Sequence, residues 1–226
     1  MKIAGFIKNS LIDYKDKICT TVFTSGCNMN CWYCQNYELL DGKHKDYYSE
    51  VMAFLNKRIG QIDAVTISGG EPTIQRDLEN FVREVKALGF LVKLDTNGLR
   101  PDVLEDLLRK NLLDYVAMDV KAPFEQYSQV TGIQINIEKL KNSIEILKNS
   151  KIDYEFRTTF SPDLTLEDIK QIGVIVKGAK NFSLQAYRQS GKTTTNVNIL
   201  PHKPSIINEG YEIIKQYVPN AKLKGI

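Results

Sequence analysis

The chain has 226 residues, 42% hydrophobic and 25% charged, which is the composition of an ordinary globular protein of one or two domains. Its formal net charge of +3 is too small to indicate a nucleic-acid or anionic-membrane partner, and no apolar run approaches a membrane span. Residues 1–17 predict a short strand and a turn rather than a secretion signal. We therefore expect a cytoplasmic protein, in whose reducing compartment clustered cysteines bind metal or do chemistry more often than they form disulfides.

In chain order, apolar and β-branched runs that predict strands alternate with apolar residues at helical spacing. Strands are predicted at 18–24, 63–68, 90–96, 114–120, 153–160 and 181–187. Helices are predicted at 47–59, 77–89, 101–111, 136–150, 164–176 and 205–218. A strand followed by a helix, six times over, favours a parallel sheet with right-handed connections.

This alternation predicts an α/β fold, namely a partial (β/α)6 TIM-like barrel of parallel strands in a single domain. A flat doubly wound sheet is the alternative. Within the domain we expect an N-terminal strand and turn over 1–17, the β/α core over 18–187, and a C-terminal loop and helix over 188–226. In either architecture, functional residues should follow the carboxyl ends of the strands.

The less usual polar residues lie at or just after the ends of the predicted strands, except Arg157, which lies within one. In chain order they are Cys27, Cys31 and Cys34, then Ser68 to Glu71, then Asp95 to Gly98, then Asp119 and Lys121, then Arg157, and finally Gln185 and Arg188. A chain with a purely structural role has no reason to repeat this placement at every strand. We therefore expect one functional rim.

The segment CNMNCWYC spaces Cys27, Cys31 and Cys34 as C-x3-C-x2-C and supplies no obvious fourth thiolate. A structural zinc site uses four closed ligands, and a [4Fe-4S] cluster normally takes four cysteines. Three thiolates leave one iron open to a substrate or cofactor, which is typical of a reactive site. The alternatives are a structural zinc knuckle or unused thiols. Cys19 lies early in its strand, where a small buried residue is expected.

These motifs resemble the radical S-adenosylmethionine superfamily. The three cysteines, with Tyr33 directly before the last, follow the first strand of the core, and Gly69-Gly70-Glu71-Pro72 follows the second. Both are hallmarks of that superfamily, and they occur in the same order and on the same elements. The resemblance covers nearly the whole chain and implies a β/α barrel.

Three finer segments resemble the activating enzymes of glycyl radical enzymes. They are Cys34-Gln35-Asn36, Leu94-Asp95-Thr96-Asn97-Gly98 and Met118-Asp119-Val120-Lys121. The chain is most similar to the anaerobic ribonucleoside-triphosphate reductase activating proteins and next to the pyruvate formate-lyase activating enzymes. It departs from them at Lys15-Asp16, where many relatives have Pro-Gly, and at Arg188, where pyruvate formate-lyase activating enzymes carry a histidine.

The resemblance implies a [4Fe-4S] cluster on the three cysteines and S-adenosylmethionine on the open iron. Reductive cleavage would give a 5′-deoxyadenosyl radical, which abstracts hydrogen from a glycine Cα of the partner enzyme. Gly69 and Gly70 would let the backbone approach the methionine moiety, and Glu71 would accept hydrogen bonds from its ammonium group. The expected cofactor-binding residues are Tyr33, Ser68, Gly69, Gly70, Glu71, Asp95, Asn97, Asp119, Lys121, Arg157 and Arg188.

A monovalent cation is expected beside the cofactor carboxylate. Asp95 and Asp119 end neighbouring strands, where two carboxylates would repel each other, and carbonyl groups of Thr96 and Ala117 could complete an oxygen shell. In the alternative arrangement, Asp119 pairs with Lys121 or Arg157 and no ion binds.

The expected partners are a glycyl radical enzyme, with anaerobic ribonucleotide reductase as first candidate, and a flavodoxin or ferredoxin as electron donor. An outside donor follows because no cysteine after Cys34 is available for a second cluster. No nucleic acid or membrane is expected. Two other functions stay open: a radical enzyme acting on a small molecule, such as a deazaguanine precursor, and a non-enzymatic metal-binding or interaction module.

Overall fold

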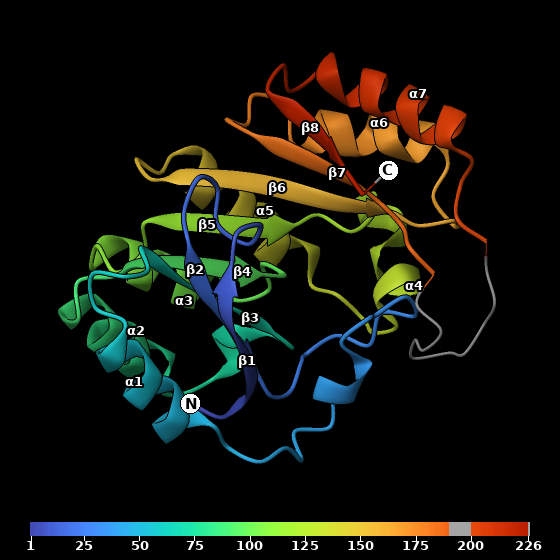
Figure 1. The fold of residues 1–226 in the computed structure, drawn as a ribbon. Coiled ribbons are helices and arrows are strands. Elements are labelled where there is room, and N and C mark those ends of the chain that lie inside the picture. Colours follow the sequence, from blue (N-terminus) through green and yellow to red (C-terminus); the bar gives the residue numbers. More distant parts are fainter. Residues whose placement is uncertain (190–199, 226) are drawn as a thin grey trace.

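A computed structural model describes residues 1–189 and 200–225, so residues 190–199 of the predicted C-terminal loop lie outside the described part. Eight strands form one sheet in the order β1 to β8 (Figure 1). They are β1 (Ile3–Ser10), β2 (Cys19–Thr24), β3 (Ala64–Gly69), β4 (Leu91–Thr96), β5 (Tyr115–Asp119), β6 (Asp153–Phe160), β7 (Phe182–Ala186) and β8 (Ala221–Lys224). Only β1 runs antiparallel to its neighbour, β2, and all other adjacent strands are parallel.

Helices connect the parallel strands and lie along the outer side of the curved sheet (Figure 1). They are α1 (Tyr48–Lys57), α2 (Leu78–Ala87), α3 (Pro101–Arg109), α4 (Tyr127–Thr131), α5 (Ile137–Lys148), α6 (Leu166–Ile175) and α7 (Pro204–Lys215). None of the helices in the described residues is both long and apolar enough to cross a membrane.

The strand order confirms the partial barrel and excludes the doubly wound alternative. A doubly wound sheet reverses its strand order at a switch point, whereas this sheet runs sequentially from β1 to β8 without reversal. The sheet does not close, because β1 and β8 pair with no strand on their outer sides in the described residues.

Among the strands and α-helices, two elements were not predicted. The first is β8, which adds a seventh parallel strand to the six expected and pairs with β7 from Phe182↔Ala221 to Gln185↔Lys224. The second is the short helix α4, whose C-cap is Gly132 in the left-handed conformation. Four or five residues are too few to show a hydrophobic period, so neither element is visible in the sequence.

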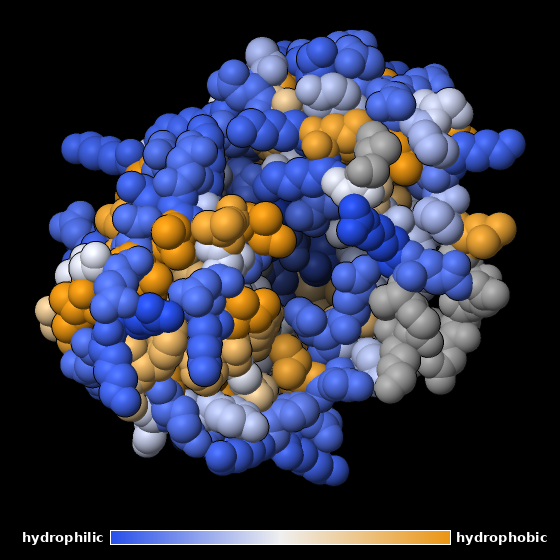
Figure 2. All heavy atoms as spheres, in the orientation of Figure 1, coloured by the Kyte–Doolittle hydropathy of each residue, from blue (hydrophilic) through white to orange (hydrophobic). Residues whose placement is uncertain are grey.

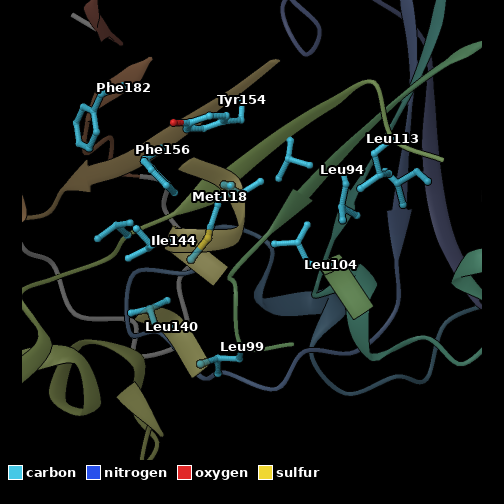
Figure 3. Packing of buried hydrophobic residues seen from close by; sticks show 14 of the residues in the cluster. Leu94, Leu99, Leu104, Leu113, Met118, Leu140, Ile144, Tyr154, Phe156 and Phe182 are labelled. Atoms are coloured by element: carbon cyan, nitrogen blue, oxygen red, sulfur yellow. The ribbon is translucent and has the colours of Figure 1, made fainter. Parts of the chain in front are cut away.

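The two faces of the sheet differ sharply in polarity. The outer face is apolar and packs against the helices; Figure 3 shows Leu94, Met118 and Phe156 on the side where Leu104 of α3 and Ile144 of α5 lie. The inner face carries polar and charged side chains that alternate with these apolar ones along each strand. The carboxyl ends of the parallel strands bring the inner polar groups together at one end of the barrel.

Candidate active site

A cavity of about 600 Å³ opens at the carboxyl ends of the parallel strands. Its wall contains every residue predicted for the site except Ala117, which is fully buried in a separate cluster with Cys19. The predicted residues on the wall are Cys27, Cys31, Tyr33, Cys34, Ser68, Gly69, Gly70, Glu71, Asp95, Thr96, Asn97, Asp119, Lys121, Arg157 and Arg188. The structure therefore gathers six strand ends around one space.

The loop that carries the three cysteines is fastened to several parts of the barrel. The Gly26 amide donates to the carbonyl of Leu39 at 2.6 Å, and the Asn30 amide donates to the carbonyl of Thr131, the last residue of α4, at 2.9 Å. From the end of β4, the side-chain amide of Asn97 donates to Asn28 at 2.7 Å. These bonds hold the cysteine loop over the cavity.

Cys27, Cys31 and Cys34 all line the cavity, whereas Cys19 is fully buried at the far end of β2. In the described residues, no three His, Cys, Asp or Glu side chains gather closely enough to hold a single metal ion. In a cubane cluster each thiolate binds a different iron, so the three sulfur atoms need not lie close enough to share one metal ion. Three thiols around one cavity fit this arrangement.

Burial raises the pKa of the Cys27 thiol to about 12 and also raises the pKa values of the Cys31 and Cys34 thiols. Metal ligation requires thiolates, so assembly of a cluster on these residues must release protons. The donor set and the cavity fit an iron–sulfur cluster, and the assignment of the three ligands stays a prediction.

Close backbone contacts explain why residues 69 and 70 are glycines, which the sequence alone did not show. A Cβ on Gly70 would lie 1.9 Å from the carbonyl oxygen of Gly26, and a Cβ on Gly69 would lie 2.2 Å from the backbone nitrogen of Thr24. Gly69 also has a φ of +117°. Gly70 therefore allows the end of β3 to pack directly against the cysteine loop, and Gly69 allows it to pack against the end of β2, whatever the two glycines contact in a bound cofactor.

Glu71 is 1% exposed, and both of its carboxylate oxygens accept hydrogen bonds from the protein. One oxygen accepts from the Thr73 amide at 3.0 Å and from the hydroxyls of Thr73 and Thr96 at 2.5 and 2.7 Å. The other accepts from the Asn97 amide at 2.7 Å. Burial raises the pKa of Glu71, and these bonds counteract the rise. The observed contacts tie β3 to β4, while contact with the cofactor ammonium group stays a prediction.

A chain of buried ion pairs crosses the floor of the cavity. The Arg157 guanidinium donates through Nη1 to Asp95 and through Nε to Asp119, both at 2.9 Å. Lys93 Nζ lies 3.1 Å from Asp95, and Lys121 Nζ lies 3.1 Å from Asp119. Burial opposes ionisation of Asp119, but Arg157 and Lys121 outweigh it and lower the pKa of that carboxyl to about 2. Both carboxylates are therefore charged and already neutralised by protein cations.

Sequence reasoning missed Lys93, and a signal for it was available. Lys93 is 5% exposed and lies two residues before Asp95 in β4, so both side chains point to the inner face of the barrel. A lysine inside an otherwise apolar strand is costly unless a carboxylate pairs with it. The Lys-Leu-Asp spacing therefore indicated this ion pair.

Trp32 packs against two tyrosine rings that line the cavity. Its ring lies edge-on to Tyr33, with centroids 5.4 Å apart, and 5.8 Å from the ring of Tyr187 at the end of β7. Its indole nitrogen donates to Asp163 at 2.9 Å. Trp32 thus links the cysteine loop to the β6 and β7 side of the cavity. Tyr187 itself was not predicted as a wall residue.

The family model of the radical SAM superfamily matches residues 21–173. A Methanocaldococcus jannaschii protein with the provisional name glycyl-radical enzyme activating enzyme MJ1227 is 34% identical over 232 residues, 99% of this chain and 96% of the relative. MJ1632, a protein of the same organism with the same provisional description, is 30% identical over 220 residues, 93% of this chain and 82% of the relative.

Among solved structures, a domain of pyruvate-formate lyase-activating enzyme from Bacteroides vulgatus superposes with a TM-score of 0.59. The superposition covers 72% of this chain and 99% of that domain. The sequence identity is 16%, so this likeness shows a shared fold alone.

Proposed function

Because the chain belongs to the radical SAM superfamily, we propose that it is the activating enzyme of a glycyl radical enzyme, with anaerobic ribonucleotide reductase as the first candidate. The observation that carries this proposal is the similarity to MJ1227, which spans both chains almost completely.

Members of the superfamily are enzymes that use a [4Fe-4S] cluster and S-adenosylmethionine. Here Cys27, Cys31 and Cys34 would hold the cluster, and the segment from Ser68 to Glu71 would lie against the methionine moiety. When bound, these groups would supply a 5′-deoxyadenosyl radical able to remove hydrogen from a glycine Cα.

Lys121 is the residue best placed to meet the carboxylate of the cofactor. It lines the cavity with the cysteines, and its side chain is 14% exposed. Burial opposes its charge, but Asp119 outweighs burial and raises the pKa of Lys121 well above its usual value. Lys121 would therefore offer a permanent cation, while Arg157 and Asp119 fix its position. Arg188, which is exposed at the mouth, would contact the outer part of the cofactor or the substrate.

The expected monovalent cation remains a prediction, and Arg157 occupies both of the carboxylates that would bind it. The guanidinium of Arg157 bridges Asp95 and Asp119 in the described residues, which is the alternative arrangement stated from the sequence. A cation would have to displace this bridge or share the two carboxylates with it. Activity in sodium, in potassium and in a bulky organic cation decides between them: equal rates and cofactor affinities mean that the protein's own cations, Arg157, Lys93 and Lys121, neutralise the pair without an added ion.

The electron donor and the compartment are part of the same proposal. The chain has four cysteines, and Cys19 is buried away from the cavity, so the remaining three can support one cluster at most. We therefore expect a separate flavodoxin or ferredoxin as the electron donor, and a cytoplasmic enzyme.

The test is to reconstitute the protein anaerobically, reduce it, and incubate it with S-adenosylmethionine and candidate glycyl radical enzymes. We expect a glycyl doublet in the electron paramagnetic resonance spectrum of anaerobic ribonucleotide reductase. The Cys31→Ala variant is the matched control and should give no signal. Cleavage of S-adenosylmethionine without a doublet on any candidate would reject the activating function and favour a small-molecule substrate.

A further inference from the structure

Lys93 and Asp95 stand in the wall between two cavities of the barrel. A second cavity of about 260 Å³ lies among the amino halves of the strands. Lys93 lines this second cavity and not the active-site cavity, whereas Asp95 lines the active-site cavity and not the second one. Their charged groups lie 3.1 Å apart. Figure 2 shows a hollow in this face of the molecule with hydrophilic side chains inside it. The ion pair therefore connects the amino end of the barrel to the site.

The ammonium group of Lys93 is held from two sides. It donates a hydrogen bond to the carbonyl of Asp13, in the loop between β1 and β2, and it pairs with the Asp95 carboxylate. Thr21 of β2 donates to the Asp13 carboxylate at 2.6 Å, which ties that loop to the inner face of the barrel. Lys93 is only 5% exposed, so its charge acts on these partners rather than on bulk water.

Lys93 is the first member of a chain of alternating charges that ends at Lys121. Asp95 follows Lys93, and then come Arg157, Asp119 and Lys121, with each neighbouring pair within 3.1 Å. Three cations thus face two carboxylates, so the chain holds one cation more than its carboxylates neutralise. The surplus charge is available to an anion that enters the cavity beside Lys121.

The other carboxylates near the chain are engaged elsewhere. Glu155 lies 3.2 Å from Lys224 and accepts a hydrogen bond from Ser183 at 2.6 Å. The Asp13 carboxylate accepts the hydrogen bond from Thr21. Neither carboxylate forms an ion pair with a member of the chain in the described residues, so neither takes up its surplus charge.

We infer that Lys93 is a positioning residue for the cofactor: by neutralising Asp95, it leaves Lys121 free to bind the carboxylate of S-adenosylmethionine. The inference rests on the proposed function, in which Lys121 meets that carboxylate. Lys93 does not line the active-site cavity, so it acts through the chain and does not touch the cofactor.

Replacing Lys93 with methionine removes its charge and keeps a long unbranched side chain. Asp95 then has Arg157 as its only cation, and the guanidinium is drawn toward it. Asp119 loses part of its share in Arg157 and depends more on Lys121. Two cations now face two carboxylates, so Lys121 binds a further carboxylate less strongly.

The test compares two ligands that differ only in the carboxylate. Each protein is reconstituted anaerobically, its iron content is measured, and its dissociation constants for S-adenosylmethionine and for decarboxylated S-adenosylmethionine are determined by equilibrium dialysis. Lys222→Met is the matched control, because Lys222 is exposed, lines the same second cavity as Lys93 and forms no ion pair with any described residue.

We expect Lys93→Met to bind S-adenosylmethionine about ten-fold more weakly than the wild type, with unchanged iron content. The decarboxylated ligand should bind equally to Lys93→Met and to the wild type. Lys222→Met should match the wild type for both ligands. The double variant Lys93→Met/Asp95→Asn removes one charge of each sign and restores the surplus cation, so it should regain the wild-type affinity for S-adenosylmethionine.

The ligand comparison separates positioning from a merely structural role. An equal loss of affinity for both ligands in Lys93→Met, or no loss for either, overturns the inference. If Lys93→Met does not fold, the double variant decides: wild-type affinity for S-adenosylmethionine supports the inference, and weaker binding overturns it.

The outcome for Lys93 is distinguishable from the outcome for the proposed function. The dissociation constants need no partner protein, so the inference can fail while a glycyl radical still forms on a candidate enzyme. Conversely, a wild type that forms no glycyl radical on any candidate rejects the activating function, and the ligand comparison still decides the role of Lys93.

Discussion

Replacing Arg157 with methionine would remove the cation shared by two buried carboxylates. In the native protein Arg157 donates to Asp95 and Asp119 at 2.9 Å each, and all three side chains are largely buried. Methionine matches much of the volume of arginine and supplies no charge. The substitution therefore leaves two negative groups facing each other at the floor of the cavity.

Removing one partner from a buried ion pair costs about 3–5 kcal/mol, because the remaining charge stays desolvated. Here Lys93 still lies 3.1 Å from Asp95 and Lys121 still lies 3.1 Å from Asp119, so the loss is partly compensated. We expect the free energy of unfolding of Arg157→Met to fall by about 3 kcal/mol at neutral pH. Arg157→Lys keeps the charge but cannot bridge both carboxylates as a fork, and should lose about 1 kcal/mol.

Urea unfolding at pH 7.5 and 4.5 measures the loss of stability in Arg157→Met and shows how that loss depends on pH. Without Arg157, burial raises the pKa values of Asp95 and Asp119 in the folded variant. A group that binds its proton more tightly when folded stabilises the fold as pH falls, so the deficit of Arg157→Met should be smaller at pH 4.5. A deficit below about 1 kcal/mol at pH 7.5, the range of surface pairs, would refute the reasoning.

Three further predictions concern other parts of the site. Gly70→Ala should displace the cysteine loop and lower iron binding, because its Cβ would lie 1.9 Å from a loop carbonyl, whereas Gly5→Ala has open space and should keep the iron content of the wild type. Cys31→Ala should lose the visible absorbance of the reconstituted cluster and Cys19→Ala should keep it; absorbance lost in both would contradict the ligand assignment. Asp119 has a pKa of about 2, below its usual 3.8, so its contribution of about 2 kcal/mol is present above pH 4 and lost as pH falls toward 2. Acid titration of stability should be shallower over that window in Asp119→Asn, and an unchanged slope would exclude the depressed pKa.

The sequence by itself determined the alternation of strands and helices and the position of the cysteine motif. Both are local properties, because a hydrophobic period is visible within one element and C-x3-C-x2-C lies within eight residues. It also placed the polar residues at strand ends, from which one rim follows once the strands are parallel. All of these predictions needed only neighbouring residues.

The tertiary structure alone decided which groups meet. Asp95 and Arg157 are 62 residues apart, and only the order and register of β4, β5 and β6 bring them to 2.9 Å. The contacts of Glu71 with β4, and the carbonyl that excludes a Cβ at Gly70, likewise come from distant segments. Strand β8 exists because the edge of β7 offers it hydrogen bonds. Which buried polar groups pair with each other depends on their distances in the folded protein, and a pattern of neighbouring residues in the sequence does not contain those distances.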